Sequence, residues 1–295
     1  MSVPLSYITV ILIWTTTPLA IKWSSEGPGF VFAVSSRMIL GALLAMMLVM
    51  IMRLDIPWHK KAIKTYLYSG LGIAVSMMFV YWAAQHIPSG WISLIFGLSP
   101  IITGLLMFAV HGKNELSKDK LFGLTLGLAG LAVIFTTGFA VSTKALMGVA
   151  AVLISTMIYS FTAIKVKQHN QGIPSLTITA AGLFFAMPAY AVCWYLMDGE
   201  VPEAIPARSG ISILYLALFG SVIGFALFFY ILKHVSASRV SLITLVTPVT
   251  ALLLGRYLNG EPLTVEIMSG AVMILAGLAS YEFGSLAQRL GADSA

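Results

Sequence analysis

The sequence predicts an all-α integral membrane protein with ten transmembrane helices, arranged as two inverted five-helix repeats. Three observations carry this prediction. The chain is 59% hydrophobic and only 9% charged, with a mean hydropathy of +0.94. Its apolar residues fall into ten runs long enough to cross a bilayer. The second half also repeats the first. With so few polar residues, the chain could not cover a water-soluble core.

Each apolar run is bounded by polar residues or by glycine and proline clusters. The first run has no basic segment before it and leads into a polar turn, so we interpret it as a helix rather than a signal peptide. The expected helices span residues 4–23, 29–52, 62–85, 88–110, 119–138, 144–166, 174–197, 209–233, 236–257 and 264–285.

The repeat divides the chain into residues 1–139 and 140–288, followed by a short tail of residues 289–295. An odd number of helices in each half inverts one half relative to the other, an arrangement typical of secondary transporters. The alternative is a duplication that only builds a bundle. The matched positions are Gly72 with Gly220, His86 with His234, Ser93-Leu94-Ile95 with Ser241-Leu242-Ile243, and Pro100 with Pro248.

Lysine and arginine residues predict the orientation of the helices. Alternate loops carry twelve of these residues on one side and four on the other, and the remaining one, Arg37, lies inside the second helix. By the positive-inside rule, both termini are expected in the cytoplasm. Because the basic residues flank apolar runs, the net charge of +6 is a membrane-flanking pattern and not a nucleic-acid site.

The helix at 88–110 carries a narrow face of small and mildly polar residues, including Ser93 and Pro100. The helix at 236–257 carries a similar face. A proline inside a helix removes one backbone donor, so the carbonyl groups of Phe96 and Thr244 are expected to be free. We interpret the two kinked helices as flanking a central substrate cavity; the alternative is that the prolines only shape the bundle.

Aromatic residues cluster near this predicted cavity. Tyr81, Trp82, Trp91 and Tyr159 are interpreted as its lining, although tryptophan and tyrosine also form belts at membrane interfaces.

Arg37 is costly within a membrane helix and should face protein or water. Because no carboxylate is expected at its depth, its partners should be backbone carbonyls, hydroxyls such as Ser35 or Ser36, or an anionic substrate group. Lys22, near the end of the first helix, either contacts protein or snorkels to the headgroups.

Several chemistries have no counterpart in the sequence. No Asp or Glu is expected deep in the membrane, and we find no nucleotide-binding loop, no metal-ligand spacing and no group to orient His86 against Ser89. We therefore expect no metal, no cofactor and no enzymatic activity, while an intramembrane enzyme remains the alternative from another class.

Glycines recur in the fifth and tenth helices, where Gly123 and Gly130 match Gly270 and Gly277. Small residues let helix backbones approach closely in lipid. The two helices are expected to pair, either within one chain or between two copies, which leaves a monomer and a homodimer both open.

These features resemble the EamA-type branch of the drug/metabolite transporter superfamily, over essentially the whole chain. The similar residues are Trp14 and Lys22 in the first helix, Pro28 followed by Arg37, and the repeated Ser-Leu-Ile segments with their prolines. The chain departs from the family at Thr15, where a glycine is common, and at Leu183, where Arg37 would recur.

The resemblance implies export of a small organic metabolite from the bacterial inner membrane by alternating access, with similarity to exporters of aromatic amino acids. The expected partners are this metabolite and membrane lipid; a drug or lipid-precursor carrier is the alternative. The candidate substrate-binding residues are Trp14, Arg37, Tyr81, Trp82, Trp91, Ser93, Phe96, Pro100, Tyr159, Tyr230, Ser241, Thr244 and Pro248.

Overall fold

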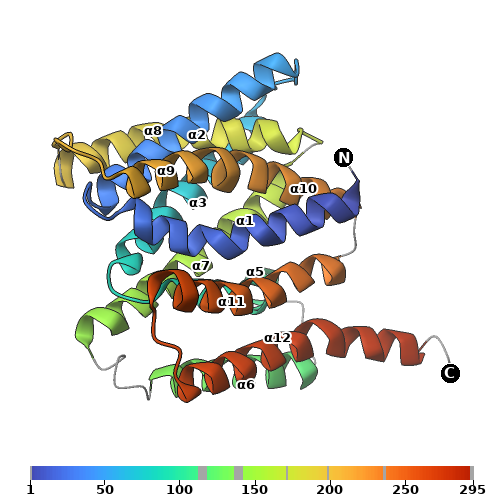
Figure 1. The fold of residues 1–295 in the computed structure, drawn as a ribbon. Coiled ribbons are helices and arrows are strands. Elements are labelled where there is room, and N and C mark those ends of the chain that lie inside the picture. Colours follow the sequence, from blue (N-terminus) through green and yellow to red (C-terminus); the bar gives the residue numbers. More distant parts are fainter. Residues whose placement is uncertain are drawn as a thin grey trace.

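Every regular element in the described part of the chain is a helix (Figure 1). The computed structural model describes residues 2–111, 118–135, 142–170, 172–197, 199–234 and 237–292. Its elements are α1 (Val3–Ser24), α2 (Phe30–Ile51), α3 (Lys60–Ala84), α4 (Ser89–Gly97), α5 (Ser99–His111), α6 (Lys118–Phe135), α7 (Thr143–His169), α8 (Ser175–Met197), α9 (Ala207–Tyr215), η1 (Leu216–Ile223), α10 (Gly224–His234), α11 (Ala237–Asn259) and α12 (Val265–Ala292).

Over the described ranges, these elements form ten helical units at the ten predicted positions. The unit predicted at 88–110 is split into α4 and α5, and the unit predicted at 209–233 is split into α9, η1 and α10. In the same ranges, seven segments are long and apolar enough to cross a membrane, and 265–281 is a shorter apolar helix. The all-helical, multi-pass fold is therefore confirmed.

The break between α4 and α5 lies beside Pro100, which is the second residue of α5. A proline in the first turn of a helix removes no hydrogen bond, because those N–H groups have no partner within the helix. At the C-terminal end of α4, backbone N–H groups bond to the carbonyls of Ile95 and Phe96. The expectation that the Phe96 carbonyl is free was therefore wrong: the helix ends and caps itself instead of bending around an open carbonyl.

Pro248 behaves differently from its match in the first half, because it lies inside the uninterrupted helix α11. The side chain of Pro248 is buried. The release of the Thr244 carbonyl remains a prediction.

The second interruption was not predicted. Residues Leu216–Ile223 form a π-helix, η1, between the α-helical segments α9 and α10. A π-helix hydrogen-bonds from residue i to residue i+5, so it is wider than an α-helix, and such segments often occur at functional sites.

Helices α6 and α12 pack against each other along one side of the bundle (Figure 1). A Cβ atom added to Gly130 would lie 2.6 Å from the carbonyl oxygen of Gly270, and one added to Gly123 would lie 2.4 Å from that of Gly277. The four glycines thus permit direct backbone contact. This confirms the predicted pairing of the two helices and places it within one chain.

Hydroxyl pairs join other helices across the bundle. Ser76 on α3 and Ser155 on α7 lie with their Oγ atoms 2.6 Å apart, and both residues are fully buried. Thr15 on α1 lies 2.7 Å from Thr250 on α11, measured between the Oγ1 atoms. Thr15 therefore joins α1 to α11 through a side-chain hydrogen bond.

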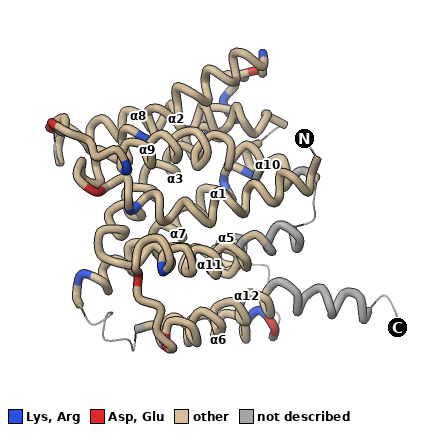
Figure 2. Tube along the Cα trace, viewed as in Figure 1, with Lys and Arg blue, Asp and Glu red and all other residues tan. Residues whose placement is uncertain are grey.

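Charged residues lie mostly near the two ends of the bundle (Figure 2). We call the end at which α1 terminates and α4 begins the Lys22 end. Helices α8 and α11 also terminate there, and α9 begins there. The start of α1 lies at the opposite end (Figure 1).

Candidate functional site

Arg37 is buried in α2, with only 2% of its surface exposed. Its Nε atom donates to the Ser221 hydroxyl at 3.1 Å, and its Nη1 atom donates to the Tyr81 hydroxyl at 3.3 Å. The guanidinium carbon also lies 5.8 Å from the centre of the Tyr81 ring. Helices α2 and α3 and the π-helix η1 therefore meet at this cation.

Glycines make room for this contact between α2 and η1. A Cβ atom on Gly220 would lie 3.0 Å from Arg37 Nη2, and one on Gly41 would lie 3.1 Å from the Ser221 Cβ atom. Larger residues at these positions would push η1 away from α2. The π-helix and the two glycines together bring Ser221 within hydrogen-bonding distance of Arg37.

The sequence predicted hydroxyl partners for Arg37, and the structure confirms that kind of partner. The residues suggested were wrong. Ser35 donates to the carbonyl of Tyr190 at 3.3 Å, and Ser36 donates to the backbone of its own helix, at Phe32 and Ala33. Both serines satisfy local carbonyls, so the hydroxyls that contact Arg37 come from other helices.

Arg37 has no acidic partner among the residues that the structure describes. The ion pairs found in those ranges are Lys22 with Glu261 and Arg208 with Glu26. A buried cation with only hydroxyl partners retains most of its desolvation cost. The site is therefore suited to an anionic group.

An apolar crevice of about 600 Å³ lies between α2, α3, α7 and α8, and Arg37, Tyr81 and Ser221 are not among the residues that line it. Tyr81 and Trp82 are neighbours on α3; Tyr81 contacts Arg37 and Trp82 lines the crevice. The Tyr190 hydroxyl donates to the Ile73 carbonyl at 3.0 Å, so it presents no free donor to the crevice. The lining residues are Phe30, Ala74, Val75, Met78, Phe79, Trp82, Met147, Ala150, Ala151, Ile154, Ala189, Tyr190, Cys193 and Met197.

The predicted site residues of α4 and α7 lie in a second region. Trp91 and Ser93 are buried, with 2% and 8% of their surfaces exposed. The ring of Phe96 stands edge-on to that of Tyr159, with the ring centres 6.4 Å apart. Pro100 is half-buried at the start of α5. Phe96 on α4 thus meets Tyr159 on α7, and none of these residues lines the crevice.

The remaining predicted residues lie on α1, α10 and α11. Trp14 is half-buried beside Gly224, whose added Cβ would lie 3.5 Å from the Trp14 Nε1 atom. Tyr230 lies over His234, with their ring centres 4.3 Å apart. Ser241 and Thr244 belong to α11, but their side chains fall outside the described residues.

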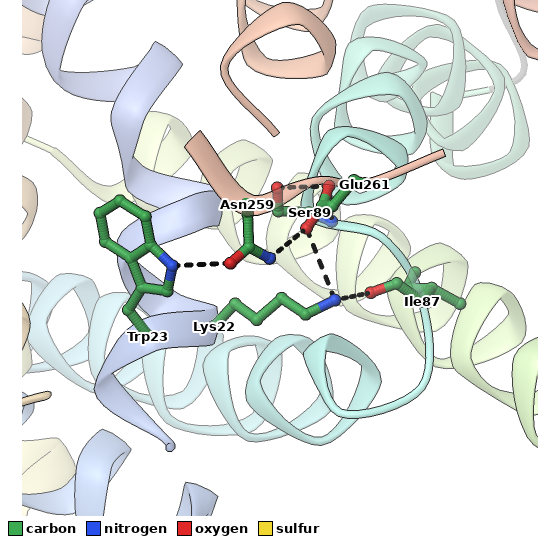
Figure 3. Close-up of polar contacts among 6 residues, drawn as sticks. All are labelled: Lys22, Trp23, Ile87, Ser89, Asn259 and Glu261. Atoms are coloured by element: carbon green, nitrogen blue, oxygen red, sulfur yellow. Dashed lines mark hydrogen bonds and ion pairs between the residues drawn. The ribbon is translucent and has the colours of Figure 1, made fainter. Parts of the chain in front are cut away.

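A polar network closes around Glu261 at the Lys22 end (Figure 3). Lys22 Nζ lies 3.5 Å from Glu261 Oε1 and donates to the Ile87 carbonyl at 3.3 Å. The backbone N–H and the hydroxyl of Ser89 both donate to Glu261 Oε2 at 2.9 Å. Asn259 Nδ2 donates to Glu261 Oε1 at 3.1 Å, and Asn259 Oδ1 accepts from Trp23 Nε1 at 2.9 Å.

The sequence left open whether Lys22 snorkels or contacts protein, and it did not connect Lys22 with Glu261. The structure shows the protein contact. One signal was present: the predicted topology places both residues at the same side of the membrane, where basic residues are few. Lys22 is joined to Glu261 because the end of α1 lies beside the loop after α11.

His86 lies in the turn between α3 and α4, as expected of a loop histidine, with its ring centre 4.6 Å from that of Trp82. Burial lowers the pKa of His86, and the positive charge of Lys144 lowers this pKa further. The neutral imidazole is thus favoured at pH 7.

The helical bundle, its apolar spans and its buried arginine define a multi-pass membrane protein. The sequence pattern of the EamA-like transporter family matches this chain twice, over residues 2–136 and 146–281. The chain belongs to this family.

Curated relatives span nearly the whole chain. An uncharacterized transporter of Archaeoglobus fulgidus is 26% identical over 90% of this chain and 93% of its own length. The uncharacterized transporter YoaV of Bacillus subtilis is 26% identical over 94% of this chain and 95% of its own. The uncharacterized inner membrane transporter YedA of Escherichia coli is 25% identical over 90% and 86%.

A protein of known crystal structure has the same fold. It superposes with a TM-score of 0.68 at 18% identity, and the match covers 98% of both chains. At this identity the likeness supports the arrangement of helices alone.

Proposed function

We propose that this protein is a secondary transporter that exports an amino acid with an aromatic or other apolar side chain across the bacterial inner membrane. The observation that carries this proposal is the buried Arg37, which lacks an acidic partner in the described residues. Helices α2 and α3, which carry Arg37 and its partner Tyr81, also line the apolar crevice. A guanidinium binds a carboxylate through paired, charge-assisted hydrogen bonds. Phe79 and Trp82 offer aromatic surface to an apolar side chain.

Alternating access is supported by the way the two halves contact each other. The units α2 and α8, α4 and α11, and α6 and α12 pack in pairs, and each pair joins helices at matched places in the two halves. Such pairing is expected of two inverted repeats that rock about a common centre. In this proposal residues 1–139 and 140–288 are the moving halves.

The orientation follows from the lysine and arginine asymmetry, which places both termini in the cytoplasm and the Lys22 end outside. YedA, a relative over most of the chain, is called an inner membrane transporter. We extend that location to this protein. The other candidate residues, from Trp14 to Pro248, would line the path between the two ends.

Counterflow in proteoliposomes tests the proposal. Vesicles containing purified protein are loaded with an unlabelled solute, and uptake of the same labelled solute is measured for a panel of aromatic, aliphatic, basic and acidic amino acids and nucleobases. We expect counterflow of aromatic or aliphatic amino acids, and its loss in Arg37→Leu at solute concentrations near the parental half-saturation, with Arg208→Met as a surface control. Counterflow of basic amino acids or nucleobases alone would contradict the proposed substrate.

A drug or lipid-precursor carrier is the second candidate, and the crevice favours it. Most of the lining residues are apolar, and the Tyr190 hydroxyl is bonded to the Ile73 carbonyl. Such a surface suits a solute that enters from lipid. In that case none of the amino acids would exchange, whereas an apolar drug or isoprenoid phosphate would displace a fluorescent apolar probe bound to the protein.

A further inference from the structure

We propose that Glu261, Lys22 and Ser89 form the gate that closes the transport path at the Lys22 end. This inference rests on the proposed transport function. The gate is an ion pair and hydrogen-bond network that holds the two halves of the chain together at that end, and it must open before a solute can leave there.

The carboxylate of Glu261 is buried, with 7% of its surface exposed, and each oxygen is fully engaged. Oε2 accepts both Ser89 bonds, while Oε1 meets Lys22 and the Asn259 amide (Figure 3). Bonds to an ionised carboxylate are stronger than those between neutral groups. Removing one partner leaves a buried charge without compensation, which is strongly unfavourable.

The network joins elements from opposite halves. Lys22 lies in the last turn of α1 and Ser89 is the first residue of α4, both within residues 1–139, whereas Glu261 lies between α11 and α12 in the second half. Any movement that separates the two halves at this end must break these contacts. Gly255 supports the closed form, because an added Cβ atom there would lie 2.4 Å from Glu261 Oε2.

A second ion pair at the same end provides a matched comparison. Arg208 contacts Glu26, and the Ser209 hydroxyl donates to the Glu26 carbonyl, so the loop after α1 is joined to α9. The side chains of Arg208 and Glu26 are 55% and 40% exposed, against 28% and 7% for Lys22 and Glu261. Exposed pairs contribute little, so the buried pair should control opening.

The test measures access to a position just inside the gate. Ser93 lies one turn beyond Ser89 on α4 and is 8% exposed. In a Cys193→Ala background, Ser93→Cys is labelled with a membrane-impermeant maleimide, both in spheroplasts and in inside-out vesicles. Breaking the buried pair by Glu261→Gln or Lys22→Met should raise the labelling rate about tenfold or more from the face at the Lys22 end.

A double variant tests whether Lys22 and Glu261 act as one pair or have independent effects on labelling. If Lys22 and Glu261 act together, Lys22→Met combined with Glu261→Gln should label no faster than the faster single variant. Arg208→Met serves as the control and should change labelling less than about twofold. Parental labelling in both single variants, or effects that multiply in the double variant, would overturn the gate.

Folding is checked by the thermal transition of each variant in detergent. If the network only stabilises the fold, the variants should have a lower thermal transition and parental labelling. That result also overturns the gate. If Glu261→Gln does not fold, Lys22→Met carries the test, because it leaves the Ser89 bonds in place. Labelling needs no substrate, so a failed counterflow experiment would refute the proposed solute without deciding the gate.

Discussion

Replacing Arg37 by leucine separates its contribution to folding from its contribution to binding. The change removes two hydrogen bonds, to Ser221 and Tyr81, and leaves both hydroxyls without that partner, at a cost of about 1–3 kcal/mol for each. It also removes a buried cation, whose desolvation costs several kcal/mol in a protein interior. These terms oppose each other, so we expect the thermal transition to move by only a few degrees.

Binding should respond much more strongly. A solute carboxylate held by Arg37 would lose a hydrogen bond to a charged group, worth about 1.5–3 kcal/mol, which corresponds to roughly a 10- to 150-fold weaker affinity. Half-saturation of counterflow, compared between the parent and Arg37→Leu, measures this loss. Arg37→Lys keeps the charge without the planar fork and should be intermediate.

Two results would refute this reasoning. Unchanged half-saturation in Arg37→Leu would reduce Arg37 to a structural residue that joins α2 to η1. A loss of folded protein would mean that the hydroxyl contacts of Arg37 outweigh its desolvation cost. Ser221→Ala is the matched control, because it removes one partner and retains the cation.

Three further predictions concern packing, the proline in α11 and topology. Gly130→Val should destabilise the protein by at least about 2 kcal/mol in thermal unfolding, because the valine side chain would meet a carbonyl oxygen of α12. Gly210→Ala is the control and should have little effect, because the nearest atom to its added Cβ lies 3.7 Å away. Pro248→Ala should preserve or raise the thermal transition, since alanine restores a backbone donor inside α11. The same variant should slow counterflow if α11 bends at this residue, whereas parental counterflow would leave Pro248 a purely structural role. Reporter fusions should give a cytoplasmic signal at Ala295 and a periplasmic signal after Glu203, and the reverse result would overturn the predicted orientation.

The sequence predicted the helices well because the signal for each helix is local. A run of about 20 apolar residues spans a membrane wherever it occurs, and all ten predicted units are found in the described residues. The pairing of α6 with α12 was also predictable, since the small residues at Gly123 and Gly130 recur at matched places in the second half. The small size of these residues is enough to indicate that the two helix backbones pack closely.

Specific partners were less predictable because they depend on how each helix is rotated about its axis. Arg37 and Ser221 are 184 residues apart, and Trp23 and Asn259 are 236 apart. Nothing local to Arg37 distinguishes Ser221 from the nearer Ser35 and Ser36. The π-helix was missed for a similar reason: its apolar residues read equally well as an α-helix, and only tertiary packing reveals the wider turn.

The departures from symmetry between the two halves converge on one contact. Arg37 has Leu183 at its matched position in α8, and η1 corresponds to the regular helix α3. At the matched glycines, Gly72 faces Thr162 whereas Gly220 faces Arg37. The arginine and the π-helix therefore occur in different halves but meet each other, and neither has a counterpart elsewhere in the described chain. A duplication that only built a bundle gives no physical reason to place both asymmetries at a single costly cation, whereas the proposed ligand site at Arg37 requires an asymmetry of this kind.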